Sequence, residues 1–330
     1  MIGAQQQIPQ QGVLTVNGIY NYTPMRLLNG TTGVIPAADQ ARQRLILGHH
    51  QEVRTITQTY TLDLNYGVTD RLAVEFTLPY LKRKHQHIDG LGESATEAGE
   101  PVNFSDNGIG DMRVMAKYNV LPALRYNVVM GFGLELPTGD TRARDSSGQI
   151  LESSGQLGRG NVGLIGSIYQ TFELIPHRLS QFAFASYRHS FRNRDGYQFG
   201  DEYQLNVGLN LVTTPWLVLT NQFNYRYLTH DNVTANLEQS AAPLAGEEPA
   251  VIDPRVLDRR VPNTGSTYFA YTPGFQLDLG QLVKSPFTEA TSMYFMAQIP
   301  LARESNNNLA QGTSFIFGFT RSFQLVKHRT

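Results

Sequence analysis

TLDLNYGVTDRLAVEFTLPY, residues 61–80, is the stretch that decides the fold of this chain. Ahead of a Gly-Val-Thr-Asp turn, the apolar Leu62 and Leu64 alternate with the polar Asp63 and Asn65, and the alternation resumes after the turn. A period of two indicates an extended strand with one apolar face and one polar face. Both strands exceed the roughly 5–6 residues usual in soluble sheets and reach the roughly 9–11 residues that cross a bilayer at a tilt. The stretch therefore predicts one hairpin of a transmembrane β-barrel.

The same alternation recurs along the chain and predicts about twelve strands, an even number, as in single-chain bacterial barrels. We expect the strands near residues 13–24, 53–67, 71–84, 109–120, 125–137, 160–173, 178–191, 200–212, 216–229, 266–279, 290–302 and 312–326. Five short turns alternate strictly with longer polar connectors at 25–52, 85–108, 138–159, 192–199, 230–265 and 303–311. Outer-membrane barrels have short periplasmic turns and longer extracellular loops. We therefore predict an all-β fold, a transmembrane antiparallel up-and-down β-barrel with both termini on the periplasmic side.

The composition is compatible with this fold and narrows the function. A hydrophobic fraction of 41% and a mean hydropathy of −0.29 resemble a soluble protein, but lipid-facing and lumen-facing residues cancel in a barrel. The sequence contains no apolar stretch long enough for a helical membrane span, which takes about 18 residues. The absence of cysteine excludes disulfides and thiolate metal sites. A net charge of −1 without a basic stripe predicts no nucleic-acid partner.

The chain is expected to divide into an N-terminal periplasmic segment, residues 1–12, and a barrel, residues 13–330. The first residues, MIGAQQQIPQQG, lack the basic region and apolar run of a signal peptide. Because an outer-membrane protein needs a signal peptide for export, we expect an exported protein of the bacterial outer membrane whose leader is not part of this sequence. The segment QQQIPQQ is too short to be a large plug but can enter the periplasmic mouth of the barrel.

Three segments carry a family likeness: YGVTDRLAVEFTLPY (66–80), NGIGDMRVMAKYNV (107–120) and FGLELPTGD (132–140). A Gly-Ile-Gly-Asp that opens a strand ending in Lys-Tyr, followed by a strand closing in Leu-Pro-Thr-Gly-Asp, resembles the outer-membrane proteins grouped as the MetA-pathway phenol-degradation family. Members are described as transporters encoded beside catabolic genes. The resemblance implies an outer-membrane channel for hydrophobic or aromatic small molecules.

The polar face of each strand should line the lumen, and its ionisable residues are the candidate site. They are Asp63, Glu75, Asp111, Arg113, Lys117, Glu135, Glu202, Arg226 and Asp278. A cross-strand pair must keep both residues on one face. Folding each hairpin about its turn predicts that Asp63 lies nearly opposite Glu75, Asp111 nearly opposite Glu135, and Glu202 opposite Arg226.

Like charges directly opposite one another are unfavourable, so the acidic residues need compensating charge. Arg113 and Lys117 on the neighbouring strand can supply it. Rings of charged side chains set ion selectivity in pores, and the pattern predicts a charged constriction around the second to fifth strands. The alternative is a salt-bridged network that only fills the barrel interior. Charged residues favour polar or ionic cargo, whereas the family likeness favours hydrophobic or aromatic cargo.

Other classes of function have weaker support. No Gly-x-Ser-x-Gly, HExxH or phosphate-binding glycine loop is present, so we predict no enzyme, although an outer-membrane hydrolase is a further alternative. The histidines at 49–50, and at 85 and 87, are placed in external loops, and neither they nor the acidic loop residues form a recognisable metal motif. We expect no cofactor and no metal. The main alternative is a closed structural or partner-binding barrel. The partners expected for the channel are outer-membrane lipid and small-molecule solutes.

Overall fold

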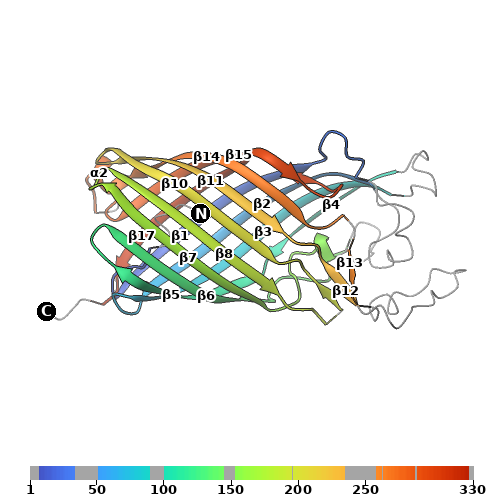
Figure 1. Ribbon diagram of the computed structural model, residues 1–330, viewed down its shortest axis with the longest axis horizontal. Coiled ribbons are helices and arrows are strands. Elements are labelled where there is room, and N and C mark those ends of the chain that lie inside the picture. Colours follow the sequence, from blue (N-terminus) through green and yellow to red (C-terminus); the bar gives the residue numbers. More distant parts are fainter. Residues whose placement is uncertain are drawn as a thin grey trace, which may run out of the picture.

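The computed structural model describes residues 7–33, 51–89, 100–144, 153–194, 196–234, 258–261, 263–286 and 288–326. Within them, twelve long strands form a closed antiparallel barrel, because β1 pairs with both β2 and β17 and every other strand pairs with its neighbours (Figure 1). The barrel strands are β1 (Val13–Arg26), β2 (Gln51–Gly67), β3 (Leu72–Asp89), β5 (Met112–Pro122), β6 (Tyr126–Leu136), β7 (Gly163–Ile175), β8 (Leu179–Ser190), β10 (Glu202–Thr214), β11 (Leu217–Leu228), β14 (Ser266–Asp278), β15 (Thr291–Glu304) and β17 (Ser314–Gln324). The predicted fold is confirmed.

The barrel has a turn end and a loop end (Figure 1). The turn end carries the short connectors and the one-turn helix α2 (Leu279–Leu282). The loop end carries a small sheet of β9 (Tyr197–Gln198), β12 (Asn232–Thr234) and β13 (Asp258–Arg260), together with β16 (Ala310–Gln311), which pairs with the end of β1. In the described part of the chain, no helix is long and apolar enough to span a membrane.

One predicted loop is instead an extension of the barrel wall. The sequence places residues 85–108 in a connector, but β3 continues to Asp89 and pairs there with β4 (Glu100–Ile109). Because β4 and β5 pair successively with the same strand, they act as one long strand interrupted at Gly110 and Asp111. The alternation of apolar and polar residues is weaker in this extension, because the extension lies beyond the apolar band, where both faces of a strand can be polar.

Residues that alternate between apolar and polar along a strand point alternately to the outside and to the inside of the barrel. Outward side chains form an apolar band in which Phe132 is 63% exposed, whereas the neighbouring inward Glu135 is 2% exposed. Soluble monomers rarely expose apolar surface on this scale. An apolar outer band with a polar interior is the pattern of a transmembrane barrel.

The cross-strand register differs from the predicted one by two residues in three hairpins. Asp63 lies opposite Thr77, Glu135 lies opposite Arg113, and Arg226 lies opposite Gln204. A four-residue turn separates β2 from β3, and β-bulges near the turn shift the pairing of β5 with β6 and of β10 with β11. A bulge adds a residue to one strand only, which the sequence pattern does not reveal. A shift of two keeps every residue on its predicted face.

The N-terminal segment enters the barrel at its turn end. Ile8 packs against inward side chains of β6, β7 and β8, namely Val129, Tyr169, Phe182 and Phe184. The backbone N–H of Gly12 donates to the carbonyl of Gly67 at 2.9 Å, which fixes the segment to the rim. A cavity of about 220 Å³ remains between the segment and the opposite wall, where polar side chains of β1, β2, β14, β15 and β17 line it. The segment therefore covers one side of the mouth. Its periplasmic location stays a prediction.

Candidate functional site: the charged lumen

The candidate lumen residues form two separate clusters rather than one constriction. The turn-side cluster contains Asp63, Glu75 and Lys117, which are 8%, 6% and 1% exposed. The Lys117 ammonium donates a hydrogen bond to Glu75. Asp63 accepts hydrogen bonds from Asn17 Nδ2 and Thr77 Oγ1, both at 3.1 Å. All three side chains therefore have partners within the wall and are closed to a passing solute.

The loop-side cluster is built around Glu135. Its carboxylate accepts hydrogen bonds from Arg113 at 2.8 Å and from Arg188 at 3.2 Å, and Arg159 Nε lies 3.7 Å away. Arg188 also donates to Glu202 at 2.7 Å, so it bridges the two carboxylates. Three guanidinium groups face two carboxylates, those of Glu135 and Glu202, which leaves an excess of one positive charge.

Arg226, the predicted partner of Glu202, is not hydrogen-bonded to it. Arg226 lies opposite Gln204, and its guanidinium stands 5.5 Å from the centre of the Tyr268 ring. Asp278, also placed in the lumen by the sequence, accepts a hydrogen bond from Gln281 N and caps the helix α2 at the turn end. These two residues therefore lie outside the ion pairs of both clusters.

Two arginines of the site are absent from the sequence prediction. Arg188 lies on β8, where Ser186, Arg188 and Ser190 alternate with outward residues, and that alternation is a usable signal. Arg159 lies between η3 (Ser153–Gly155) and β7, in a connector that folds into the lumen, and no periodicity places such a residue.

The connector between β6 and β7 is clasped to the barrel wall by Asp111. Its carboxylate accepts backbone hydrogen bonds from Gly139 at 3.0 Å and from Arg159 at 2.7 Å, one on each side of the connector. Gly139 packs on Gly158 so closely that an added Cβ would lie 2.6 Å from the Gly158 Cα. The Gly-Ile-Gly-Asp and Leu-Pro-Thr-Gly-Asp segments thus meet in three dimensions, and both serve to hold the connector inside.

Two further side chains hold the connector, Thr138 from the connector itself and Arg83 from β3. Thr138 Oγ1 donates to the carbonyl of Gly110 at 2.9 Å and accepts from the backbone N–H of Met112 at 2.9 Å. On the other side, the Arg83 guanidinium donates to the carbonyls of Gly155 and Gln156 at 2.8 and 3.1 Å. The connector is therefore anchored at both of its described ends.

A cavity of about 300 Å³ lies beside the loop-side cluster. Arg113, Arg159 and Arg188 line it together with the apolar Leu81, Leu157 and Phe199. The Arg113 side chain is enclosed by the barrel yet 43% exposed to this space, and that of Arg159 is 25% exposed, whereas Glu135 is 3% exposed. Burial lowers the pKa of Arg159 to about 10, so it stays cationic at neutral pH. A solute in the cavity therefore meets mainly guanidinium groups, because the Glu135 and Asp111 carboxylates that also line it are almost fully buried.

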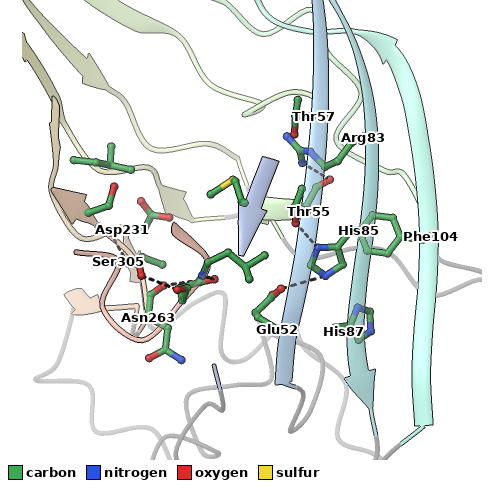
Figure 2. Close-up of a pocket in the computed structure, with 18 residues that line it drawn as sticks. Glu52, Thr55, Thr57, Arg83, His85, His87, Phe104, Asp231, Asn263 and Ser305 are labelled. Atoms are coloured by element: carbon green, nitrogen blue, oxygen red, sulfur yellow. Dashed lines mark hydrogen bonds and ion pairs between the residues drawn. The ribbon is translucent and has the colours of Figure 1, made fainter. Parts of the chain in front are cut away.

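A vestibule of about 290 Å³ opens above this cavity at the loop end (Figure 2). His85 and Phe104 stand on one side, Asn263 and Ser305 stand opposite, and Arg83 also lines the cavity below. The rings of His85 and Phe104 are 4.8 Å apart. The vestibule therefore offers both aromatic and polar surface to an entering molecule.

The histidines 85 and 87 lie in β3 and not in a loop, which corrects the sequence prediction. His85 Nδ1 is hydrogen-bonded to Thr55 Oγ1 at 2.7 Å, and its Nε2 lies 3.3 Å from Glu52. Among the described residues, no three histidine, aspartate or glutamate side chains gather as a metal site would require. The histidines 49 and 50 lie outside the described residues. The predicted absence of a metal and of a cofactor stays a prediction.

Comparison with known proteins identifies a matching family and a shared fold. A family model described as "Putative MetA-pathway of phenol degradation" matches residues 47–244, more than half of the chain. The crystal structure of an outer membrane channel from Pseudomonas putida F1 superposes with a TM-score of 0.59 at 13% identity, covering 98% of this chain and 99% of that one. A Pseudomonas aeruginosa FadL homologue gives a TM-score of 0.39 at 10% identity, covering 98% and 92%. No curated protein matches the sequence.

Proposed function

Because the chain belongs to the MetA-pathway phenol-degradation family, whose segments between residues 66 and 140 it carries, we propose that it is an outer-membrane channel for the passive diffusion of small molecules. The selectivity region of this channel is the loop-side cluster, and its preference is for small anions. The turn-side cluster acts as part of the wall. The short turns face the periplasm, and the loop end faces the exterior.

The observation that carries the proposal is the unequal exposure of opposite charges. The guanidinium groups of Arg113 and Arg159 are partly exposed to the cavity, while the carboxylates of Glu135 and Asp111 that also line it are almost fully buried. Rings of exposed charge in a pore attract ions of the opposite sign. The apolar Leu81, Leu157 and Phe199 on the same cavity suit the hydrocarbon part of an organic anion. A small organic anion with a hydrocarbon part therefore satisfies both the expectation of polar cargo and the expectation of aromatic cargo.

The channel proposal is tested by the swelling of liposomes that contain the purified barrel. Small organic anions are expected to enter faster than cations of equal size. If liposomes that contain folded barrel swell no faster than protein-free liposomes, the result would instead favour the alternative of a closed structural or partner-binding barrel. The expectation that the chain is not an enzyme stays a prediction.

The Asp111 clasp gives a second prediction, for the conductance of the pore. In the Asp111→Ala variant the backbone N–H groups of Gly139 and Arg159 lose their acceptor. Hydrogen bonds to a charged group stabilise by about 1.5–3 kcal/mol each, so the inward position of the connector should lose more than tenfold in population. We expect larger single-channel conductance steps in a planar bilayer.

Asp140→Ala is the matched control, since Asp140 accepts from Arg142 N within the same connector and does not reach the wall. An Asp111→Ala barrel with unchanged conductance would show that the connector does not limit the pore.

A further inference from the structure

A patch of basic side chains covers the outer surface of β1, β2 and β3 near the loop end. Arg26, Arg54, Lys82 and Lys84 are all exposed and point away from the lumen. They border the apolar band directly, because the outward residues beyond Tyr60 and Tyr80, on the side toward the turn end, are leucine and phenylalanine. The patch therefore lies where a lipid bilayer changes from acyl chain to headgroup.

The register of the three strands places these residues on successive rungs. Tyr20, Tyr60 and Tyr80 lie side by side on the first rung. On the following rungs, Gln58 lies opposite Lys82, Ile56 opposite Lys84, and Arg26 opposite Arg54. Neighbouring strands are about 4.8 Å apart and rungs on one face about 6.6–7 Å apart, so the four charges fall within the span of one large lipid headgroup.

The tyrosine rung forms an ordered aromatic base beneath the charges. The rings of Tyr20 and Tyr60 are 5.1 Å apart, and those of Tyr60 and Tyr80 are 6.5 Å apart. The Lys82 ammonium stands 5.7 Å from the centre of the Tyr60 ring, which holds this charge over the interface. Aromatic rings with a polar group prefer the membrane–water interface. The rung therefore marks the level of the lipid headgroups.

Within the part of the chain that the structure describes, the outer wall supplies no compensating charge to these basic residues. Across the outward positions of these rungs, from Tyr20 to Arg26, Arg54 to Tyr60 and Tyr80 to Gln86, no aspartate or glutamate occurs. Arg26, Arg54 and Lys84 form no hydrogen bond or ion pair among the described residues. Like charges directly opposite one another, as Arg26 and Arg54 are, destabilise a sheet. An external anion would relieve this repulsion.

We propose that this patch binds the phosphates of an anionic lipid of the outer leaflet, of the kind represented by bis-phosphorylated lipid A. Guanidinium groups donate bidentate hydrogen bonds to phosphate oxygens, and ammonium groups add point charges. The two phosphates contact the basic rungs, and the acyl chains lie along the apolar band below the tyrosines. This inference rests on the outer-membrane location proposed above but does not require an open lumen.

The test compares three barrels in binding to lipid A by native mass spectrometry. In the first variant Arg26, Arg54, Lys82 and Lys84 are all changed to Gln. In the control variant four exposed basic residues at the turn end, Arg71, Arg125, Arg178 and Lys284, are changed to Gln, so that the loss of charge is equal. Each basic residue at a membrane surface strengthens the binding of an anionic lipid about fivefold, so the patch variant, which loses four of them, should bind several hundredfold more weakly. The control should bind as the unmodified barrel does.

Equal binding by the patch variant, or an equal loss in the control variant, would overturn the proposal. So would displacement of the lipid by millimolar inorganic phosphate, because the patch would then recognise free phosphate. Conductance of the patch variant is expected to match the unmodified barrel. An unmodified barrel that binds lipid A but passes no current would contradict the proposed channel and leave this inference standing.

Discussion

Replacing Lys117 with methionine is expected to lower the free energy of unfolding by about 3–5 kcal/mol, the largest effect of any single change proposed for this barrel. Lys117 is 1% exposed and donates its hydrogen bond to Glu75, which is 6% exposed. Methionine keeps most of the side-chain volume but leaves the Glu75 carboxylate buried beside Asp63 without a cation. An uncompensated buried charge is far more costly than a lost surface ion pair.

The measurement is the urea midpoint of the barrel refolded in liposomes. Lys84→Met is the matched control, since Lys84 is exposed and should change stability little. The double variant Lys117→Met with Glu75→Gln should regain a large part of the loss, because it removes the unpaired charge. If the single and double variants unfold alike, packing rather than charge explains the role of Lys117.

Replacing Arg113 with alanine is expected to move ion selectivity toward cations. Its guanidinium is the most exposed charge of the loop-side cluster, and Glu135 would keep Arg188 and, at 3.7 Å, Arg159. Solvent screening limits the effect to about 1 kcal/mol, or roughly fivefold in the permeability ratio of anion to cation. Stability should fall less than in Lys117→Met, since Glu135 remains compensated.

The check is the reversal potential of the Arg113→Ala variant in a planar bilayer, with Arg125→Ala as the control at the turn end. Arg125 is exposed outside the lumen and should leave selectivity unchanged. A reversal potential that shows greater anion selectivity, or that shifts equally in both variants, would show that Arg113 does not belong to the selectivity region.

The sequence predicts the barrel and which residues point inward or outward, because the alternation of apolar and polar residues is a local property of each strand. Asp63 and Glu135 are inward as expected, since a side chain on a strand has only two faces to occupy. Which inward residues meet depends on turn length and bulges. That is why Glu135 pairs with Arg113, where the predicted register would have set it nearly opposite Asp111.

Parts of the site that leave the strands cannot be predicted in this way. Arg159 reaches Glu135 from a connector, and its position depends on the Asp111 clasp and on the close contact of Gly139 with Gly158. These contacts join segments that are distant in the chain. The motifs themselves are visible in the sequence, but their shared role becomes apparent only when the strands are paired.

The separation of the charges changes the meaning of the predicted constriction. The sequence suggests one mixed group in which Arg113 and Lys117 compensate the same acids. In the structure Lys117 is buried against Glu75, and Arg113 faces the cavity. Of the two clusters described, the loop-side cluster is the one exposed to a cavity, so the proposed selectivity is that of arginine.

The proposed anion-selective channel is tested by the reversal potential of the unmodified barrel in a planar bilayer under a potassium chloride gradient. We expect stable open steps and a permeability to chloride that exceeds the permeability to potassium. A preference for potassium, or no open steps from a barrel shown to be folded, would contradict it.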